Sequence, residues 1–201
     1  MLIQNSLKEY LNILAKKTSV PGGGSAAALV SASGAALNSM AAHFSLKNNL
    51  SETSEIKSLL KQNEVIRKKL MLLVDKDADA YEQLSYATKL PKDSLERKSL
   101  MQKNLKKAAQ IPLEISILSC DCLQLCSQLV LKANFNLLSD LGCAAYFLES
   151  GFYSAALNAS VNLKLIKDQS FCVQRYKLIR KMALKVTALK RKIVQSVESQ
   201  V

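Results

Sequence analysis

Three consecutive glycines, Gly22, Gly23 and Gly24, stand directly before Ser25 and an alanine-rich run that reaches Ala42. Glycine permits backbone conformations that side chains forbid, and it lets another group approach the backbone closely. A helix beginning at Gly24 or Ser25 would direct its unpaired N–H groups, and the positive end of its dipole, at whatever occupies the loop. The pattern therefore predicts an anion-binding site. The alternative is a tight turn before a buried helix.

A carboxylate interrupts the apolar face of another predicted helix. Leu70, Val74, Tyr81 and Leu84 recur at helical spacing, and the position that completes this stripe is Asp77. Burial among apolar groups raises the pKa of a carboxyl group, so that it can hold and release a proton near neutral pH. General acid–base catalysis needs such a group, which makes Asp77 the candidate catalytic residue. The alternative is that Asp77 hydrogen-bonds a lysine or a helix N-terminus across the bundle.

A second group of polar side chains lies late in the chain. Asn134 and Asp140 flank a predicted loop and helix start, and Asn158 and Asn162 share a helix face with apolar neighbours. Amides in an apolar face must be hydrogen-bonded, either within the protein or to a ligand. These four residues are therefore candidate binding residues. Contacts between helices, or between two subunits, account for them equally well.

The residues that bind metals elsewhere do not form a metal-binding pattern here. The run Asp75–Asp79 resembles a calcium loop, but Ala80 and Tyr86 stand where the loop needs its glycine and its bidentate glutamate. The cysteines crowded at 120–126 lack a fourth ligand at suitable spacing, and His43 is the only histidine. We expect no metal and no tightly bound cofactor. Without a secretory signal the five cysteines are expected to be reduced thiols in a cytoplasmic protein.

Helices must position these candidate residues, and helical periodicity dominates the chain. The expected helices cover roughly residues 7–14, 24–42, 55–90, 94–131, 139–151, 154–166 and 171–197. No segment shows convincing alternation of apolar and polar residues at the β period. The predicted fold is therefore an all-α, multi-helix bundle in a single domain, 1–201. Because one small monomer covers such long helices incompletely, we expect it to dimerise through them.

Caps and breakers set the expected helix ends. Ser51 or Thr53 is a plausible N-cap after a polar break at 48–54. Asp93 and Ser94 can cap the helix that follows Pro91. Proline inside a helix removes a hydrogen bond and clashes with the preceding turn, so Pro112 is expected to kink or break its helix.

The charge balance narrows the class of partner. The net charge of +12 favours anionic partners, such as nucleic acid, a membrane surface or a polyanionic small molecule. No stretch is suited to span a membrane. A non-catalytic bundle that binds nucleic acid or protein through a basic C-terminal helix is the alternative of another class. Only 5% of the residues are aromatic and no nucleic-acid-binding motif is recognised, so the sequence argues against nucleic-acid binding.

Four segments in order resemble the cyclodeaminase/cyclohydrolase family of folate enzymes, over nearly the whole chain. They are Pro21–Ala28 with Gly34–Leu37 and Met40, Asp75–Tyr81 with Leu90-Pro91, Ala108–Leu113, and Asn134–Asp140 continuing to Gly151, Asn158 and Asn162. The resemblance implies an all-helical homodimer. It also implies chemistry on the one-carbon bridge of a tetrahydrofolate derivative, either methenyltetrahydrofolate cyclohydrolase or formimidoyltetrahydrofolate cyclodeaminase activity.

The family also places a catalytic aspartate in the segment around Asp77, which the stripe reached independently. By the same resemblance, Gly22–Ser25 would hold an anionic or carbonyl group of the folate. Asn134, Asp140, Asn158 and Asn162 would orient the pterin or polarise the bridge. The basic surface would attract a polyglutamate tail. We expect the cyclohydrolase reaction, because no formiminotransferase domain is present to deliver formimino-folate.

Overall fold

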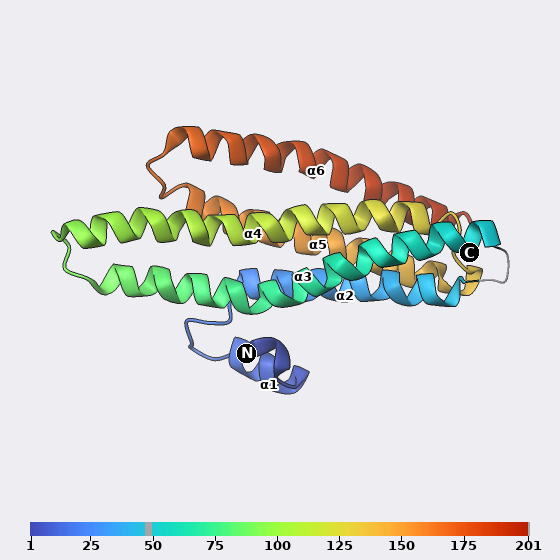
Figure 1. Cartoon of the computed structure of the whole chain (residues 1–201), viewed down its shortest axis with the longest axis horizontal. Coiled ribbons are helices and arrows are strands. Elements are labelled where there is room, and N and C mark those ends of the chain that lie inside the picture. Colours follow the sequence, from blue (N-terminus) through green and yellow to red (C-terminus); the bar gives the residue numbers. More distant parts are fainter. Residues whose placement is uncertain (47–49, 201) are drawn as a thin grey trace.

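Long helices run alongside one another, and one short helix lies outside them (Figure 1). The computed structural model describes residues 1–46 and 50–200 of the chain. Over these residues the elements are η1 (Leu2–Gln4), α1 (Leu7–Leu14), α2 (Gly23–Phe44), α3 (Leu50–Lys89), α4 (Leu95–Leu129), η2 (Phe135–Leu137), α5 (Leu138–Leu163) and α6 (Gln169–Glu198). The described part of the chain contains no strand, so the predicted all-α bundle is confirmed.

The helix starts follow the local sequence in part. Ser94 caps α4 by accepting a hydrogen bond from the Arg97 N–H at 3.0 Å, as expected. Because α3 already begins at Leu50, Ser51 and Thr53 lie inside its first turn and are not its N-caps, contrary to expectation. Residue 48 of the predicted polar break lies outside the described residues.

Helix α5 continues through Gly151, where two separate helices were expected. The expectation was wrong because Gly151 does not end the helix and instead leaves room for a neighbouring helix. A Cβ at Gly151 would lie 2.0 Å from the Ser31 Oγ and 3.2 Å from the Ala27 carbonyl oxygen on α2. The Ser31 hydroxyl is itself held there, 2.8 Å from Ala27 O and 2.8 Å from Ser119 Oγ. The glycine therefore lets α2 and α5 approach closely.

Helix α4 also continues, through Pro112. Of the kink or break expected at Pro112, the break does not occur, and the helix proceeds to Leu129. Proline in a helix interior costs about 3 kcal/mol. Here Pro112 and the apolar residues of the following turns are buried against neighbouring helices. That packing offsets the lost hydrogen bond.

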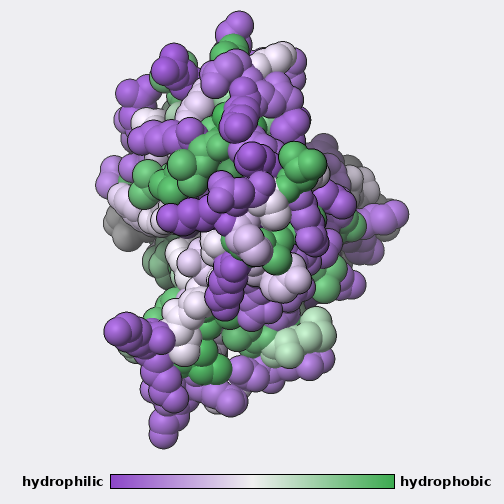
Figure 2. Space-filling view, turned by 90° about the vertical axis from the view of Figure 1, so that its left-hand side faces the viewer, coloured by the Kyte–Doolittle hydropathy of each residue, from purple (hydrophilic) through white to green (hydrophobic). Residues whose placement is uncertain are grey.

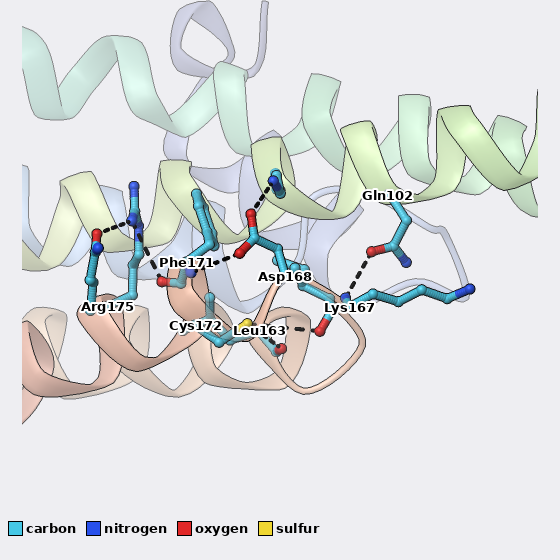
Figure 3. A network of polar contacts seen from close by, with 10 residues as sticks. Gln102, Leu163, Lys167, Asp168, Phe171, Cys172 and Arg175 are labelled. Atoms are coloured by element: carbon cyan, nitrogen blue, oxygen red, sulfur yellow. Dashed lines mark hydrogen bonds and ion pairs between the residues drawn. The ribbon is translucent and has the colours of Figure 1, made fainter.

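The outer helices differ in how they attach. Helix α6 buries Val186 and Ile193 fully, and lysines cover its outer side. Figure 3 shows how the turn before α6 contacts α4: Gln102 accepts the Lys167 N–H at 2.8 Å. Lys106 of α4 also pairs with Asp168 at 2.8 Å. Asp168 also caps α6 by accepting the Phe171 N–H.

Helix α1 lies below the bundle in Figure 1, and only Tyr10 of this helix is buried. Leu7 and Leu11, which share its apolar stripe, are 71% and 57% exposed. Figure 2 shows the end of the molecule that carries the α3–α4 and α5–α6 turns, where hydrophilic side chains cover most of the surface. In the described part of the chain, no helix combines the length and the apolarity needed to cross a membrane.

Candidate active site

A small cavity lies where the start of α2 meets α3, α4 and the last turns of α5. Its volume is about 190 Å³. The residues that line it are Ser19, Val20, Gly22, Gly23, Gly24, Asp77, Tyr81, Ala108, Pro112, Asn158 and Asn162. The fold therefore brings together the glycines, the aspartate and two of the asparagines that the sequence singled out. They come from three helices that are far apart along the chain.

The Asp77 carboxylate occupies the space that a side chain at residue 24 would fill. A Cβ at Gly24 would lie 2.2 Å from Asp77 Oδ1 and 2.5 Å from Oδ2. No described glycine has a positive φ, so the predicted conformational freedom is not used. The close approach that glycine permits is used, because the Asp77 carboxylate lies against residue 24. The Val20–Pro21 peptide bond is cis, and Gly22 is the N-cap residue of α2.

Two opposing effects act on Asp77. Burial raises the pKa of this carboxyl above its usual value, and a hydrogen bond from the Ser25 backbone N–H partly lowers it. The N–H groups of a first helical turn lack partners within the helix, so Asp77 satisfies one of them. The structural alternative from the sequence, a bond to a helix N-terminus, is thus present. Because burial is the larger effect, the same group is also set up to exchange a proton.

A buried tyrosine, Tyr10, contacts the first turn of α2. The hydroxyl groups of Tyr10 and Ser25 are 3.1 Å apart, and both side chains are buried. Burial raises the pKa of Tyr10, its hydrogen bond with Ser25 lowers that pKa in part, and the charges of Asp77 and Asp75 raise it. Tyr10 thereby remains a neutral hydrogen-bonding partner. In the sequence Tyr10 stands among Leu7, Leu11 and Leu14 at helical spacing, a pattern that carries no signal for its polar contact.

Asn158 and Asn162 stand one turn apart on α5, at the rim of the cavity. The Asn158 side-chain nitrogen donates to the Ser154 carbonyl at 2.8 Å, and that of Asn162 donates to the Ala108 carbonyl at 2.8 Å. These bonds hold the amides in place. Within residues 1–46 and 50–200, their side-chain oxygens accept no hydrogen bond, and both residues line the cavity, so a ligand N–H could donate to these oxygens.

The structure does not bring Asn134 and Asp140 to this cavity within one chain. Asn134 is the N-cap residue of η2, and its backbone N–H donates to the Ser45 hydroxyl at 2.8 Å. Ser45 ends α2, whereas the cavity lies at its beginning, roughly 33 Å away for a helix of this length. Asp140 lies in the first turn of α5, at the same far end.

Several lining residues were not predicted as site residues. Tyr81 follows Asp77 by one helical turn and was placed in the apolar stripe. Ala108 and Pro112 lie in a segment that carried the family resemblance, which is the signal that could have identified them. A larger hollow of about 650 Å³ between α3 and α4 is lined by Lys76, Lys107 and others. It contains neither Asp77 nor a glycine, so the smaller cavity is the candidate active site.

The described residues include no group of three or more His, Cys, Asp or Glu side chains that could hold a metal ion. The cavity offers one carboxyl, backbone N–H groups and amide oxygens. Such a set can bind and polarise an organic ligand and exchange one proton with it.

Comparison with known proteins places this fold and site in a family. The family model described as formiminotransferase-cyclodeaminase matches residues 6–196. The chain therefore belongs to the formiminotransferase-cyclodeaminase family, whose members include folate cyclohydrolases and cyclodeaminases. The predicted resemblance is confirmed.

Individual relatives agree with this membership. The chain is 32% identical to methenyltetrahydrofolate cyclohydrolase of Methylorubrum extorquens, over 98% of this chain and 97% of that protein. It is 32% identical to formimidoyltransferase-cyclodeaminase of Sus scrofa over 86% of this chain, but only 33% of that longer protein. The crystal structure of formiminotetrahydrofolate cyclodeaminase from Thermotoga maritima superposes with a TM-score of 0.90 at 26% identity, covering 99% of this chain and 98% of that one.

Proposed function

We propose that this protein is a methenyltetrahydrofolate cyclohydrolase, which adds water to methenyltetrahydrofolate and yields formyltetrahydrofolate. The observation that carries the proposal is the partly buried carboxyl of Asp77, facing a cavity built from backbone N–H groups and two amides. The cyclohydrolase from Methylorubrum extorquens supports this choice, because the similarity extends over nearly the full length of both chains.

In the proposed reaction, ionised Asp77 accepts a proton from the water that attacks the bridge carbon. A carbon–oxygen bond forms, and the bridge carbon becomes tetrahedral between two folate nitrogens. One carbon–nitrogen bond then breaks, and the departing nitrogen takes the proton from Asp77. The hydroxyl on the bridge carbon loses its proton to solvent and becomes the formyl carbonyl. One water is consumed and one proton is released.

The other cavity groups bind and orient in this proposal. The N–H groups of Gly23 and Gly24 belong to the first turn of α2 and point toward negative charge on the ligand, such as developing charge on oxygen. The free amide oxygens of Asn158 and Asn162 accept N–H groups of the pterin. Exposed lysines around the molecule would attract a polyglutamate tail if the folate carries one.

A second candidate is formimidoyltetrahydrofolate cyclodeaminase activity, which the structural similarity to the formiminotetrahydrofolate cyclodeaminase of Thermotoga maritima favours. In that reaction the bridge carbon also becomes tetrahedral between two folate nitrogens, but ammonia departs and no water is added. Asp77 would then protonate the leaving amine. The same cavity serves either reaction.

The test follows methenyltetrahydrofolate by its absorbance with the purified protein. We expect faster loss of the methenyl signal, and a loss of rate on the order of 10²–10⁴ in Asp77→Asn. Asp79→Asn is the matched control, because Asp79 is exposed on the same helix and does not line the cavity. Activity on formimino-folate alone would select the second candidate, and no activity on either folate would contradict the proposal.

A further inference from the structure

Pro112 leaves one backbone carbonyl of α4 without its usual hydrogen-bond donor. In an α-helix each carbonyl accepts a hydrogen bond from the N–H four residues later, and proline has no N–H. Because α4 continues through Pro112, the carbonyl that loses its helical donor is that of Ala108. Ala108 and Pro112 are both buried, and an unpaired carbonyl is unfavourable in such a place.

The Asn162 side chain on α5 supplies the replacement donor. Its Nδ2 donates to the Ala108 carbonyl oxygen at 2.8 Å, across two helices that pack against each other (Figure 1). The same nitrogen donates to the Asn158 carbonyl at 3.3 Å, one turn back on its own helix. An asparagine amide has two N–H donors, so both are used. The bond to α4 can form because residue 112 has no N–H to compete for the Ala108 oxygen.

These two bonds fix which way round the Asn162 amide lies. Turning the amide over would place its Oδ1 against two carbonyl oxygens, which have no hydrogen to donate. Nδ2 therefore faces Ala108 and Asn158, and Oδ1 is left as a hydrogen-bond acceptor on a residue that lines the cavity. A ligand N–H is favoured at this point, and a ligand carbonyl oxygen is disfavoured.

We propose that Pro112 is a positioning residue of the active site, which frees the Ala108 carbonyl to hold the Asn162 amide with its oxygen available to a substrate N–H. The identity of that substrate, a folate whose pterin carries N–H groups, rests on the proposed function. Pro112 acts through Asn162 in this arrangement. Substitutions at the two positions must therefore have coupled effects, whereas a proline that only packs against its neighbours would act independently of Asn162.

The first experiment measures this coupling by stability, without any substrate. In an otherwise wild-type chain, Asn162→Ala leaves the buried Ala108 carbonyl without a donor, so the midpoint of urea unfolding should fall. In Pro112→Ala the N–H of residue 112 is restored and can donate to that carbonyl. Adding Asn162→Ala to this variant should then lower the midpoint much less. Equal shifts in the two backgrounds would overturn the proposal, because the two residues would not share one carbonyl.

Two variants serve as matched controls. The Asn158 amide donates to the Ser154 carbonyl, which keeps its helical donor in α5. Asn158→Ala should therefore shift the midpoint equally with and without Pro112. Pro91→Ala changes an exposed proline after the end of α3, where the last carbonyls lack helical donors in any case. It should leave KM unchanged.

The second experiment measures KM and kcat on methenyltetrahydrofolate. Pro112→Ala should raise KM roughly 2- to 10-fold, the effect of weakening one hydrogen bond, with little change in kcat because Asp77 is untouched. In an Asn162→Ala background the same substitution should not raise KM further.

An unchanged KM in Pro112→Ala would show that the Asn162 amide needs no such support, and the positioning role would be wrong. It would be equally wrong if Pro112→Ala raised KM in the Asn162→Ala background, since the proline ring would then contact the substrate directly. A chain that shows the coupling in stability but has no activity on either folate would instead overturn the proposed function alone.

Discussion

At the scale of single residues, the site depends on the absence of a Cβ at Gly24. The Asp77 carboxylate can reach the start of α2 because residue 24 has no Cβ. Only there does Asp77 accept the Ser25 N–H and face the cavity at the same time. The requirement is steric, since none of the described glycines uses a positive φ.

A matched pair of glycine substitutions tests this requirement. In Gly24→Ala the new Cβ would lie 2.2 Å from Asp77 Oδ1, so the carboxylate must move and lose its hydrogen bond. We expect Gly24→Ala to lower kcat on the folate substrate by at least about tenfold. Gly142→Ala, on α5 and away from the cavity, meets nothing nearer than Val197 at 3.8 Å and should change kcat little. Equal rates in the two variants, measured by methenyl absorbance, would show that the close approach is not needed.

The pKa of Asp77 predicts how stability varies with pH. Burial raises this pKa in the folded protein above its value in the unfolded chain, so folding favours the protonated carboxyl. Its contribution is present below the unfolded pKa and is lost as pH rises through the folded pKa. Asp77→Asn cannot ionise and can still accept the Ser25 N–H. We therefore expect this variant to be more stable than wild type in urea at pH 7.

The same titration sets two further expectations. The stability difference should disappear below about pH 4, where the carboxyl is protonated in both states. In the proposed mechanism ionised Asp77 is the base, so kcat/KM should rise with pH through its pKa. A variant less stable than wild type at pH 7 would show that the capping role outweighs the cost of burial.

At the scale of helices, close contact between α2 and α5 holds the cavity in shape, because the two helices carry its glycines and its asparagines. Ser31 on α2 lies against Gly151 on α5, and Gly23 lies against Asn158 farther along the same contact. On the other side of α2, the buried Asn63 of α3 donates to the Ala35 carbonyl at 2.7 Å and to Ser39 Oγ at 2.8 Å. Helix α2 is thus held by helices on both sides.

Two glycines of α5 provide the test at this scale. Gly151→Ala would place a Cβ 2.0 Å from Ser31 Oγ, and such overpacking typically costs about 1–3 kcal/mol of unfolding free energy. Gly142→Ala meets nothing nearer than Val197 at 3.8 Å. Because alanine favours helix, that variant should be stabilised by up to about 1 kcal/mol. Urea denaturation measures both, and a stable Gly151→Ala would mean that the two helices can separate without cost.

At the scale of the whole molecule, charge and apolar surface are segregated. Lysines and arginines lie on α1, α3, α4 and α6, while α2 and α5 carry none. Exposed basic residues of α6 include Lys177, Arg180 and Lys181, the stripe that the nucleic-acid alternative would use. The uncharged face of α2 and α5 is the least repulsive surface for the dimer expected from the sequence.

This segregation predicts the effect of salt on the dimer expected from the sequence. Repulsion between two copies, each with a net charge of +12, is screened as ionic strength rises, whereas apolar contacts are not weakened. We expect the dissociation constant to fall between about 0.02 M and about 0.2 M salt. Sedimentation or light scattering at several concentrations measures it. A dimer that dissociates as salt is added would instead depend on ion pairs.

The sequence by itself determined the helical class, most helix boundaries and the residues that conflict with their surroundings, such as Asp77 in an apolar stripe. These features depend on local periodicity and on the physical chemistry of single side chains. The tertiary structure decided the features that depend on neighbouring helices. Helix α5 continues through Gly151, Pro112 does not end α4, and the Tyr10 hydroxyl contacts Ser25. The tertiary structure also separated Asn134 and Asp140 from the cavity of their own chain. Local spacing carries no information about which distant faces pack together, because that choice depends on how closely the backbones can approach.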